Sequence, residues 1–188
     1  GFSATDLLIP AEDGSEAYVF SGSGRHLRTL HGLTGANLYQ FAYDSAGRLT
    51  TITDGDGNVT TVQRDGSGIP TTLVGPFGQQ TTLTQNADGY LATIKNPALE
   101  TNSFTYDANG LLTAMTDPRG NVSQYEHDAV GRLTRADDRA GGFQTLQRSE
   151  LPSGYEATRA TALDRQTRYR VERLATGVER WTTTDPDG

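Results

Sequence analysis

The 188-residue chain has no cysteine, one methionine and one tryptophan, and only 34% of its residues are hydrophobic. The absence of cysteine excludes disulfides, thiolate metal sites and cysteine nucleophiles. It suits an exported bacterial protein stabilised by repetition, and it is also compatible with the cytosol. No apolar run approaches the roughly 18 residues that a membrane-spanning helix needs. The low apolar content argues against a thick core, while 22 glycines and many threonines favour tight turns and short strands. We therefore expect a thin all-β structure.

The chain is acidic, with a formal net charge of -7 at pH 7. This charge disfavours binding to nucleic acid or to anionic lipid. The first residues, Gly1-Phe2-Ser3, lack the charged and apolar regions of a signal peptide. The last residues, Asp185-Pro186-Asp187-Gly188, are typical of a turn with no strand after it. We expect both ends to be cut edges of a longer polypeptide.

One glycine recurs along the chain at a near-constant interval. The first interval is 23 residues and the next four are 21 residues each, at Gly24, Gly47, Gly68, Gly89, Gly110 and Gly131. An aromatic residue and an aspartate precede the glycine in the pairs Tyr43-Asp44, Tyr106-Asp107 and His127-Asp128. A leucine follows two positions after it, at Leu49, Leu91, Leu112 and Leu133. A fixed period of this length predicts an array of one repeated structural unit.

A second turn begins seven positions after the glycine in each unit. It typically opens on Asp or Asn, which accepts backbone amide hydrogens, and closes on a glycine that tolerates positive φ: Gly57, Gly78, Gly120 and Gly141. Two turns about ten residues apart predict consecutive short antiparallel strands. A type I turn followed by a left-handed glycine predicts bulged hairpins. Leu99 breaks the glycine rule, so we expect either strain or a different turn in that unit.

The strand between two turns alternates aromatic and small residues. Phe104 and Tyr106 are two positions apart, so their rings are expected on one face of the sheet. Leu112 and Met115 are three positions apart, which places them on opposite faces of a regular strand. Either a bulge near the turn corrects this, or both faces carry apolar side chains.

These residues resemble the YD-repeat family, also called Rhs repeats, which includes Rhs polymorphic toxins, the B and C shell components of toxin complexes, and teneurins. The likeness covers roughly residues 41–149, with degenerate units where Arg64 and Gln85 replace tyrosine. The resemblance implies a spiralling antiparallel sheet of hairpins that closes into a hollow shell over many repeats. It suggests irregular hairpins at 1–40, regular repeats at 41–150 and longer irregular hairpins at 151–188. Three strands are expected in the last region, at 155–163, 166–174 and 178–184, and free sheet edges invite edge-to-edge self-association.

One acidic turn is a weak candidate for a calcium site. Asp54, Asp56 and Asn58, with Asp65 further on, fall at positions of a calcium-binding loop. However, Val59 stands where that loop needs glycine, and aspartate is a weak final ligand. A hairpin turn is therefore the preferred interpretation, and no cofactor is expected.

No catalytic constellation is visible, and we do not expect an enzyme. His26, His31 and His127 lie at no recognised ligand spacing, and nearly all aspartates occupy turn positions. Asp117-Pro118 resembles the Asp-Pro autocleavage site of Rhs shells but occupies an ordinary turn. The arginine-rich stretch at 165–180 favours cross-strand ion pairs on a solvated face.

Two functions from different classes fit these features. The resemblance implies a structural shell segment of a larger secreted or cell-surface protein, which encloses or presents a C-terminal effector (toxin) domain. Its partners would then be the remaining YD repeats and that effector. The alternative is an extracellular adhesion or glycan-binding module, in which exposed rings such as Trp181 or Tyr90 stack on sugars. An enzyme with paired carboxylates acting on polysaccharide is disfavoured, because the acids follow the turn pattern.

Overall fold

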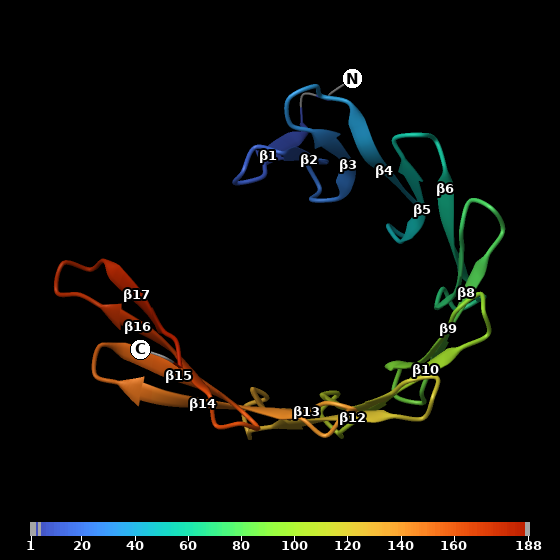
Figure 1. Cartoon of the computed structure of the whole chain (residues 1–188). Helices are drawn as coiled ribbons and strands as arrows, with labels where there is room; N and C mark the ends of the chain where they lie inside the picture. Colours follow the sequence, from blue (N-terminus) through green and yellow to red (C-terminus); the bar gives the residue numbers. More distant parts are fainter. Residues whose placement is uncertain (1–2, 4, 187–188) are drawn as a thin grey trace. The chain divides into compact units, whose positions relative to one another are not determined.

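The computed structural model describes residue 3 and residues 5–186, which form one antiparallel sheet of seventeen strands (Figure 1). Gly1, Phe2, Asp187 and Gly188, which belong to the expected chain-end segments, lie outside the described residues. The all-β prediction is confirmed. The strands are β1 Leu7–Pro10, β2 Glu16–Phe20, β3 His26–His31, β4 Asn37–Tyr43, β5 Leu49–Asp54, β6 Val59–Arg64, β7 Pro70–Val74, β8 Gln80–Gln85, β9 Leu91–Lys95, β10 Thr101–Tyr106, β11 Leu112–Thr116, β12 Val122–His127, β13 Leu133–Asp137, β14 Phe143–Leu151, β15 Gly154–Thr161, β16 Gln166–Arg173 and β17 Glu179–Thr184.

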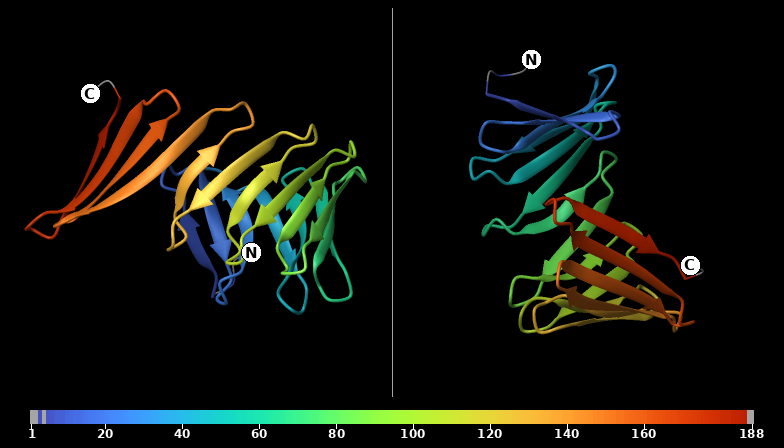
Figure 2. Two further views of the ribbon diagram at one scale, coloured as in Figure 1. Left: turned by 90° about the horizontal axis from the view of Figure 1, so that it is seen from below. Right: turned by 90° about the vertical axis from the view of Figure 1, so that its left-hand side faces the viewer.

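Successive strands pair with one another inside two compact parts of the chain. One part holds the residues up to 84 together with 94–100, and the other part holds 85–93 and 101–188. In the first part the pairing runs in chain order from β1 to β8, and in the second part it runs from β10 to β17. Figure 2 shows neighbouring hairpins lying side by side within each of these two parts. Such a meander needs only short local connections, as the two-turn repeat predicts.

The recurring glycine closes the first turn of each unit in the expected way. In the turn between β4 and β5, the Gly47 amide donates to the Asp44 carbonyl at 2.9 Å, and the Asp44 amide donates to the Arg48 carbonyl at 2.9 Å. Gly47 has a φ of 80°, in the left-handed region that glycine enters without strain. The same backbone bonds and positive φ recur at Gly68, Gly89, Gly110 and Gly131. The turn prediction is confirmed.

Leu99 makes the same turn as the glycines, so strain is the correct one of the two expectations. Its amide donates to the Asn96 carbonyl at 2.9 Å, and the Asn96 amide donates to the Glu100 carbonyl at 2.9 Å. Leu99 has a φ of 66°, which a residue with a Cβ adopts only at a cost. Its side chain is 72% exposed and therefore recovers little of that cost through burial.

A bulge places Leu112 and Met115 on the same face. Leu112 lies opposite Tyr106 and Met115 lies opposite Phe104, with a register shift between Thr105 and Tyr106. Tyr106 and Phe104 are two positions apart and share a face, so their partners share it too. The same shift occurs beside the first turn in β4–β5, β6–β7 and β12–β13. The bulge is thus a regular part of the unit, and it resolves the question left open by the spacing.

The register gives each unit one aromatic and aliphatic face. This aromatic face carries Phe20, Phe41, Tyr43, Leu49, Ile52, Leu73, Phe104, Tyr106, Leu112, Met115, Tyr125 and Leu133. The opposite face carries mainly threonine and other polar residues, for example Thr51, Thr53, Thr61, Thr72 and Thr82. Among the described residues only Val19, Leu30 and Val171 form a buried hydrophobic core. Hydrogen bonds between neighbouring strands therefore hold much of the structure together, as the low apolar content suggests.

The C-terminal strands are longer than those of the array. β14 has nine residues and β15 and β16 have eight each, and they pair in register with β17. The three predicted strands are therefore present. Their starts lie within one residue of the expected ones, β15 and β16 end two and one residues earlier than expected, and β17 ends as expected. The expected ion pairs are also present, because Glu172 binds Arg180 on the next strand at 2.6 Å and Arg170 on its own strand at 2.7 Å.

Candidate functional site

The tyrosine of the repeat ties one hairpin to the hairpin before it. The Tyr43 hydroxyl donates to the His26 carbonyl at 2.7 Å, and the Tyr106 hydroxyl donates to the Leu91 carbonyl at 2.9 Å. Each accepting carbonyl stands two residues after the preceding unit's glycine. We call this bond the inter-unit clamp. It lies on a half-buried face, where an unsatisfied carbonyl is penalised.

Arg64 makes the same inter-unit clamp with a different side chain. Its Nη2 donates to the Leu49 carbonyl at 3.1 Å, the position equivalent to His26 and Leu91 in the other two clamps. Its Nη1 donates to the Gly68 carbonyl at 3.2 Å. The sequence pattern treats this unit as degenerate, yet the clamp is kept. The signal available in the sequence was chemical: arginine is long and carries N–H donors that reach a carbonyl as tyrosine does.

The aspartates at the first turn position hold the turns together with their carboxylates. The Asp107 carboxylate accepts from the Leu111 and Asn109 amides at 2.9 Å each. These backbone bonds favour the charged form and lower the pKa of Asp107, the Leu111 amide contributing most. Bonds from Arg48 lower the pKa of Asp44 in the same way. This role uses the carboxylates locally and leaves them pointing at their own backbone.

Asp117 is the most enclosed of these carboxylates, with 8% of its surface exposed. It accepts from the Asn121 side chain, from the Asn121 and Arg119 amides, and from Arg139 Nη1, each at 2.9 Å. Arg139 belongs to the corresponding turn of the next unit, so the bond joins two turns. The Asn121 side chain and these further donors lower the pKa of Asp117 from 3.8 to about 2. The Asp117-Pro118 step thus lies in an ordinary, fully bonded turn.

Three residues of the calcium candidate, Asp54, Asp56 and Asn58, share one turn, and Asp65 lies in another. The Asp54 carboxylate accepts from the Asn58 side chain at 2.9 Å, the Asn58 amide at 2.9 Å and the Asp56 amide at 3.0 Å, and these bonds lower its pKa. Asp65 lies in the turn at the other end of β6. Asp65 therefore does not share a loop with the other three residues. Within the described part of the chain, no group of three or more His, Cys, Asp or Glu is arranged to hold a metal ion.

The three histidines are separated and occupy structural positions. The His26 ring lies between Phe20, at 4.9 Å between centroids, and Phe41, at 4.4 Å. His31 Nδ1 accepts from the amides of its own turn at 3.3 Å. His127 takes the tyrosine position of its unit and lies opposite Leu133. These placements do not bring the histidines together.

The comparisons with known proteins agree with this geometry. The family model described as Teneurin YD-shell matches residues 4–183. The chain belongs to the teneurin YD-shell family. The match extends over both flanks, beyond the residues 41–149 on which the sequence resemblance rests.

Two curated relatives share short segments with this YD-shell chain. Teneurin-4 of Mus musculus is 48% identical over 50 residues, which are 27% of this chain and 2% of that protein. Teneurin-m of Drosophila melanogaster is 42% identical over 60 residues, which are 30% of this chain and 2% of that protein. The aligned segments thus cover 2% of the length of these relatives.

A solved structure shares the fold over nearly the whole chain. The crystal structure of TcdB2-TccC3 superposes with a TM-score of 0.53 at 16% identity, covering 97% of this chain and 13% of that one. The likeness shows that the two chains share the fold of the hairpin meander. The described residues include no helix long and apolar enough to cross a membrane.

Proposed function

We propose that this YD-shell segment is a wall of a larger secreted or cell-surface polypeptide and encloses or presents a C-terminal effector (toxin) domain. Its partners are the remaining YD repeats and that effector. The inter-unit clamp is the observation that carries the proposal, because in three repeat units the same contact joins a hairpin to the one before it. A structure stabilised by nearest-neighbour contacts can extend over many units.

The residues that define the repeat serve this wall in the proposal. The tyrosines bind across units, the aspartates cap turns, the glycines adopt left-handed turn conformations and the leucines cover the aromatic face. These residues are Tyr43, Asp44, Gly47, Leu49, Gly57, Gly68, Gly78, Gly89, Tyr106, Asp107, Gly110, Leu112, Gly120, His127, Asp128, Gly131 and Leu133. A wall of this kind requires residues that pair strands and form turns, and these residues have those roles in the proposal.

Protease protection tests the enclosure. The natural polypeptide that contains this segment is digested under native conditions, and the cleavage rate of its C-terminal domain is compared with that of the same domain expressed alone. Enclosure predicts much slower cleavage in the natural polypeptide, and faster cleavage when Gly110→Val disrupts the wall. Equal rates for the natural polypeptide and the isolated domain would contradict the proposal.

Glycan binding is the second candidate, and one exposed ring favours it. Trp181 lies on the aromatic face of β17 with 71% of its surface exposed, which is a suitable platform for a sugar ring. The other ring considered, Tyr90, packs on Tyr106 with centroids 5.1 Å apart. Loss of glycan-array signal in Trp181→Ala, but not in Tyr90→Phe, would support this function. An array without signal for the unmodified chain would argue against it.

A further inference from the structure

One unit departs from the repeat on its aromatic face. The position five residues after the glycine carries a large aliphatic side chain in four units: Ile52, Leu73, Ile94 and Met115. In the next unit this position is Ala136, which lies opposite Tyr125. The Phe104 ring has Met115 opposite it, whereas the Tyr125 ring has only a methyl group. The small residue leaves one side of that ring uncovered.

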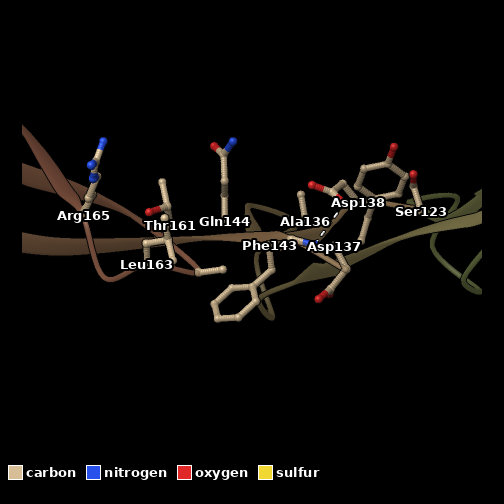
Figure 3. Close-up of a pocket in the computed structure, with 12 residues that line it drawn as sticks. Ser123, Ala136, Asp137, Asp138, Phe143, Gln144, Thr161, Leu163 and Arg165 are labelled. Atoms are coloured by element: carbon tan, nitrogen blue, oxygen red, sulfur yellow. Dashed lines mark hydrogen bonds between the residues drawn. The ribbon is translucent and has the colours of Figure 1, made fainter. Parts of the chain in front are cut away.

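A hollow of about 530 Å³ lies over Ala136. Its lining includes Ser123, Tyr125, Gln144, Thr161 and Arg165. Figure 3 shows Ala136, Gln144, Thr161 and Arg165 on one side of the sheet and Phe143 on the other. The hollow crosses β12 to β15, so it is about 14 Å long at the usual strand spacing of about 4.8 Å. This length suits a short linear oligomer lying across the strands.

Apart from the two aspartates of the lining, the polar side chains over the hollow make no hydrogen bond within the described part of the chain. The Thr161 hydroxyl is buried and makes no hydrogen bond within the described part of the chain. No side-chain hydrogen bond or ion pair among the described residues involves Ser123, Tyr125, Gln144 or Arg165. Buried polar groups are usually hydrogen-bonded, so an unpartnered hydroxyl beside a hollow needs an explanation.

Among the described residues, Arg165 is the one cation that lines the hollow and makes no ion pair there, whereas both acids of the lining direct their carboxylates to other groups. Asp137 binds Arg135 at 2.7 Å, and its side chain belongs to the opposite face. The Asp138 carboxylate accepts from the Ala140 amide at 2.7 Å and the Gly142 amide at 3.0 Å. An unpaired guanidinium beside engaged acids favours a ligand that carries carboxylates.

We propose that this hollow binds a linear oligosaccharide that carries carboxylates, of the uronic acid type. The strands under the hollow are paired with a neighbour on both sides, so their backbone groups are already hydrogen-bonded. Hydrogen bonds to a ligand therefore come from the hydroxyl, amide and guanidinium groups of the side chains. These groups match a polyhydroxylated ligand, while the uncovered Tyr125 ring provides a stacking face. A peptide strand would instead add at a free sheet edge through its backbone. The site does not depend on the enclosure of an effector.

Titration calorimetry of the intact chain tests the site with three probes. Tetragalacturonate is expected to bind, and maltotetraose, which lacks carboxylates, is expected to bind at least about tenfold more weakly. Tetraglutamate carries the charge without the sugar and is expected not to bind. No heat with tetragalacturonate would overturn the proposal. Binding of tetraglutamate at equal or higher affinity would also overturn it, in favour of a peptide site.

Four variants separate binding from folding. Ala136→Met restores the residue type of Met115, so it should fill the hollow, abolish tetragalacturonate binding and leave the thermal midpoint unchanged or raised. Thr161→Val should raise the midpoint and weaken binding, because it removes a buried unpartnered hydroxyl. Arg165→Gln should remove the preference for tetragalacturonate over maltotetraose. Arg119→Gln, at an exposed turn of the preceding unit, is the control and should bind as the unmodified chain does.

The Ala136→Met result is decisive if the variant folds. Unchanged tetragalacturonate affinity in this variant would place any binding elsewhere and overturn the site. If Ala136→Met does not fold, unchanged affinity in both Thr161→Val and Arg165→Gln overturns it instead. Protease protection of the C-terminal domain is independent of every one of these outcomes, so the failure of one proposal does not imply the failure of the other.

Discussion

Replacing Tyr106 with phenylalanine removes one inter-unit clamp and no other interaction of comparable energy. The hydroxyl donates to the Leu91 carbonyl at 2.9 Å on a half-buried face, and the ring remains to cover its neighbours. Loss of the donor leaves the carbonyl without that partner. A bond of this kind contributes about 1 kcal/mol to the free energy of unfolding. For a chain of this length, that corresponds to a thermal midpoint lower by about 2–4 °C.

Tyr90→Phe is the matched control for this prediction. The Tyr90 ring packs against the Tyr106 ring, but its hydroxyl takes part in no hydrogen bond among the described residues. Urea unfolding followed by circular dichroism should therefore give a lower free energy of unfolding for Tyr106→Phe and an unchanged value for Tyr90→Phe. Equal values for the two variants would refute the clamp as a source of stability.

Three further variants test the turns. Asp117→Asn should flatten the pH dependence of the free energy of unfolding, measured by urea unfolding between pH 2 and pH 4. The folded-state pKa of Asp117, about 2, is below the ordinary value of 3.8. The carboxylate therefore stabilises the fold fully above about pH 4, and this contribution is lost as the pH falls towards 2. Leu99→Gly should raise the free energy of unfolding by up to about 1 kcal/mol, because it relieves a φ of 66° at an exposed position. Gly110→Ala should destabilise the chain more than Gly120→Ala in thermal melts, because both glycines have positive φ but only a Cβ at Gly110 meets the Tyr90 ring.

Each of these outcomes can fail in a defined way. Parallel pH profiles for the unmodified chain and Asp117→Asn would show that the turn bonds do not favour the charged carboxylate. A lower thermal midpoint in Leu99→Gly would show that the exposed leucine contributes more than its backbone strain removes. Equal midpoints for the two alanine variants would remove the steric role of the Tyr90 ring.

The regular part of the fold follows from the sequence because it depends on local chemistry. The period, the turn residues and the alternation of Phe104 and Tyr106 are read directly from neighbouring positions. The bulge beside the first turn was one of two alternatives, since the spacing of Leu112 and Met115 fits both. Backbone register decided between them.

The features that the sequence could not provide depend on contacts between units. Arg64 departs from the consensus, and its clamp depends on the carbonyl of Leu49 fifteen residues earlier. The bond from Arg139 to Asp117 spans 22 residues and two turns of similar sequence. The hollow over Ala136 requires the register that sets this residue opposite Tyr125. Each depends on which residues lie opposite or above one another, and a period alone does not give that.

Native-state hydrogen exchange measured by mass spectrometry tests most directly that a hairpin is held by a donor from the next one, as it is through Tyr43, Arg64 and Tyr106. In Tyr106→Phe, peptides covering 86–116 should exchange faster than in the unmodified chain, while peptides covering 16–64 should be unchanged. Tyr43→Phe should give the converse pattern, with faster exchange at 16–64 and unchanged exchange at 86–116. A uniform change along the chain in both variants, or no change in either, would contradict a wall stabilised unit by unit through its clamps.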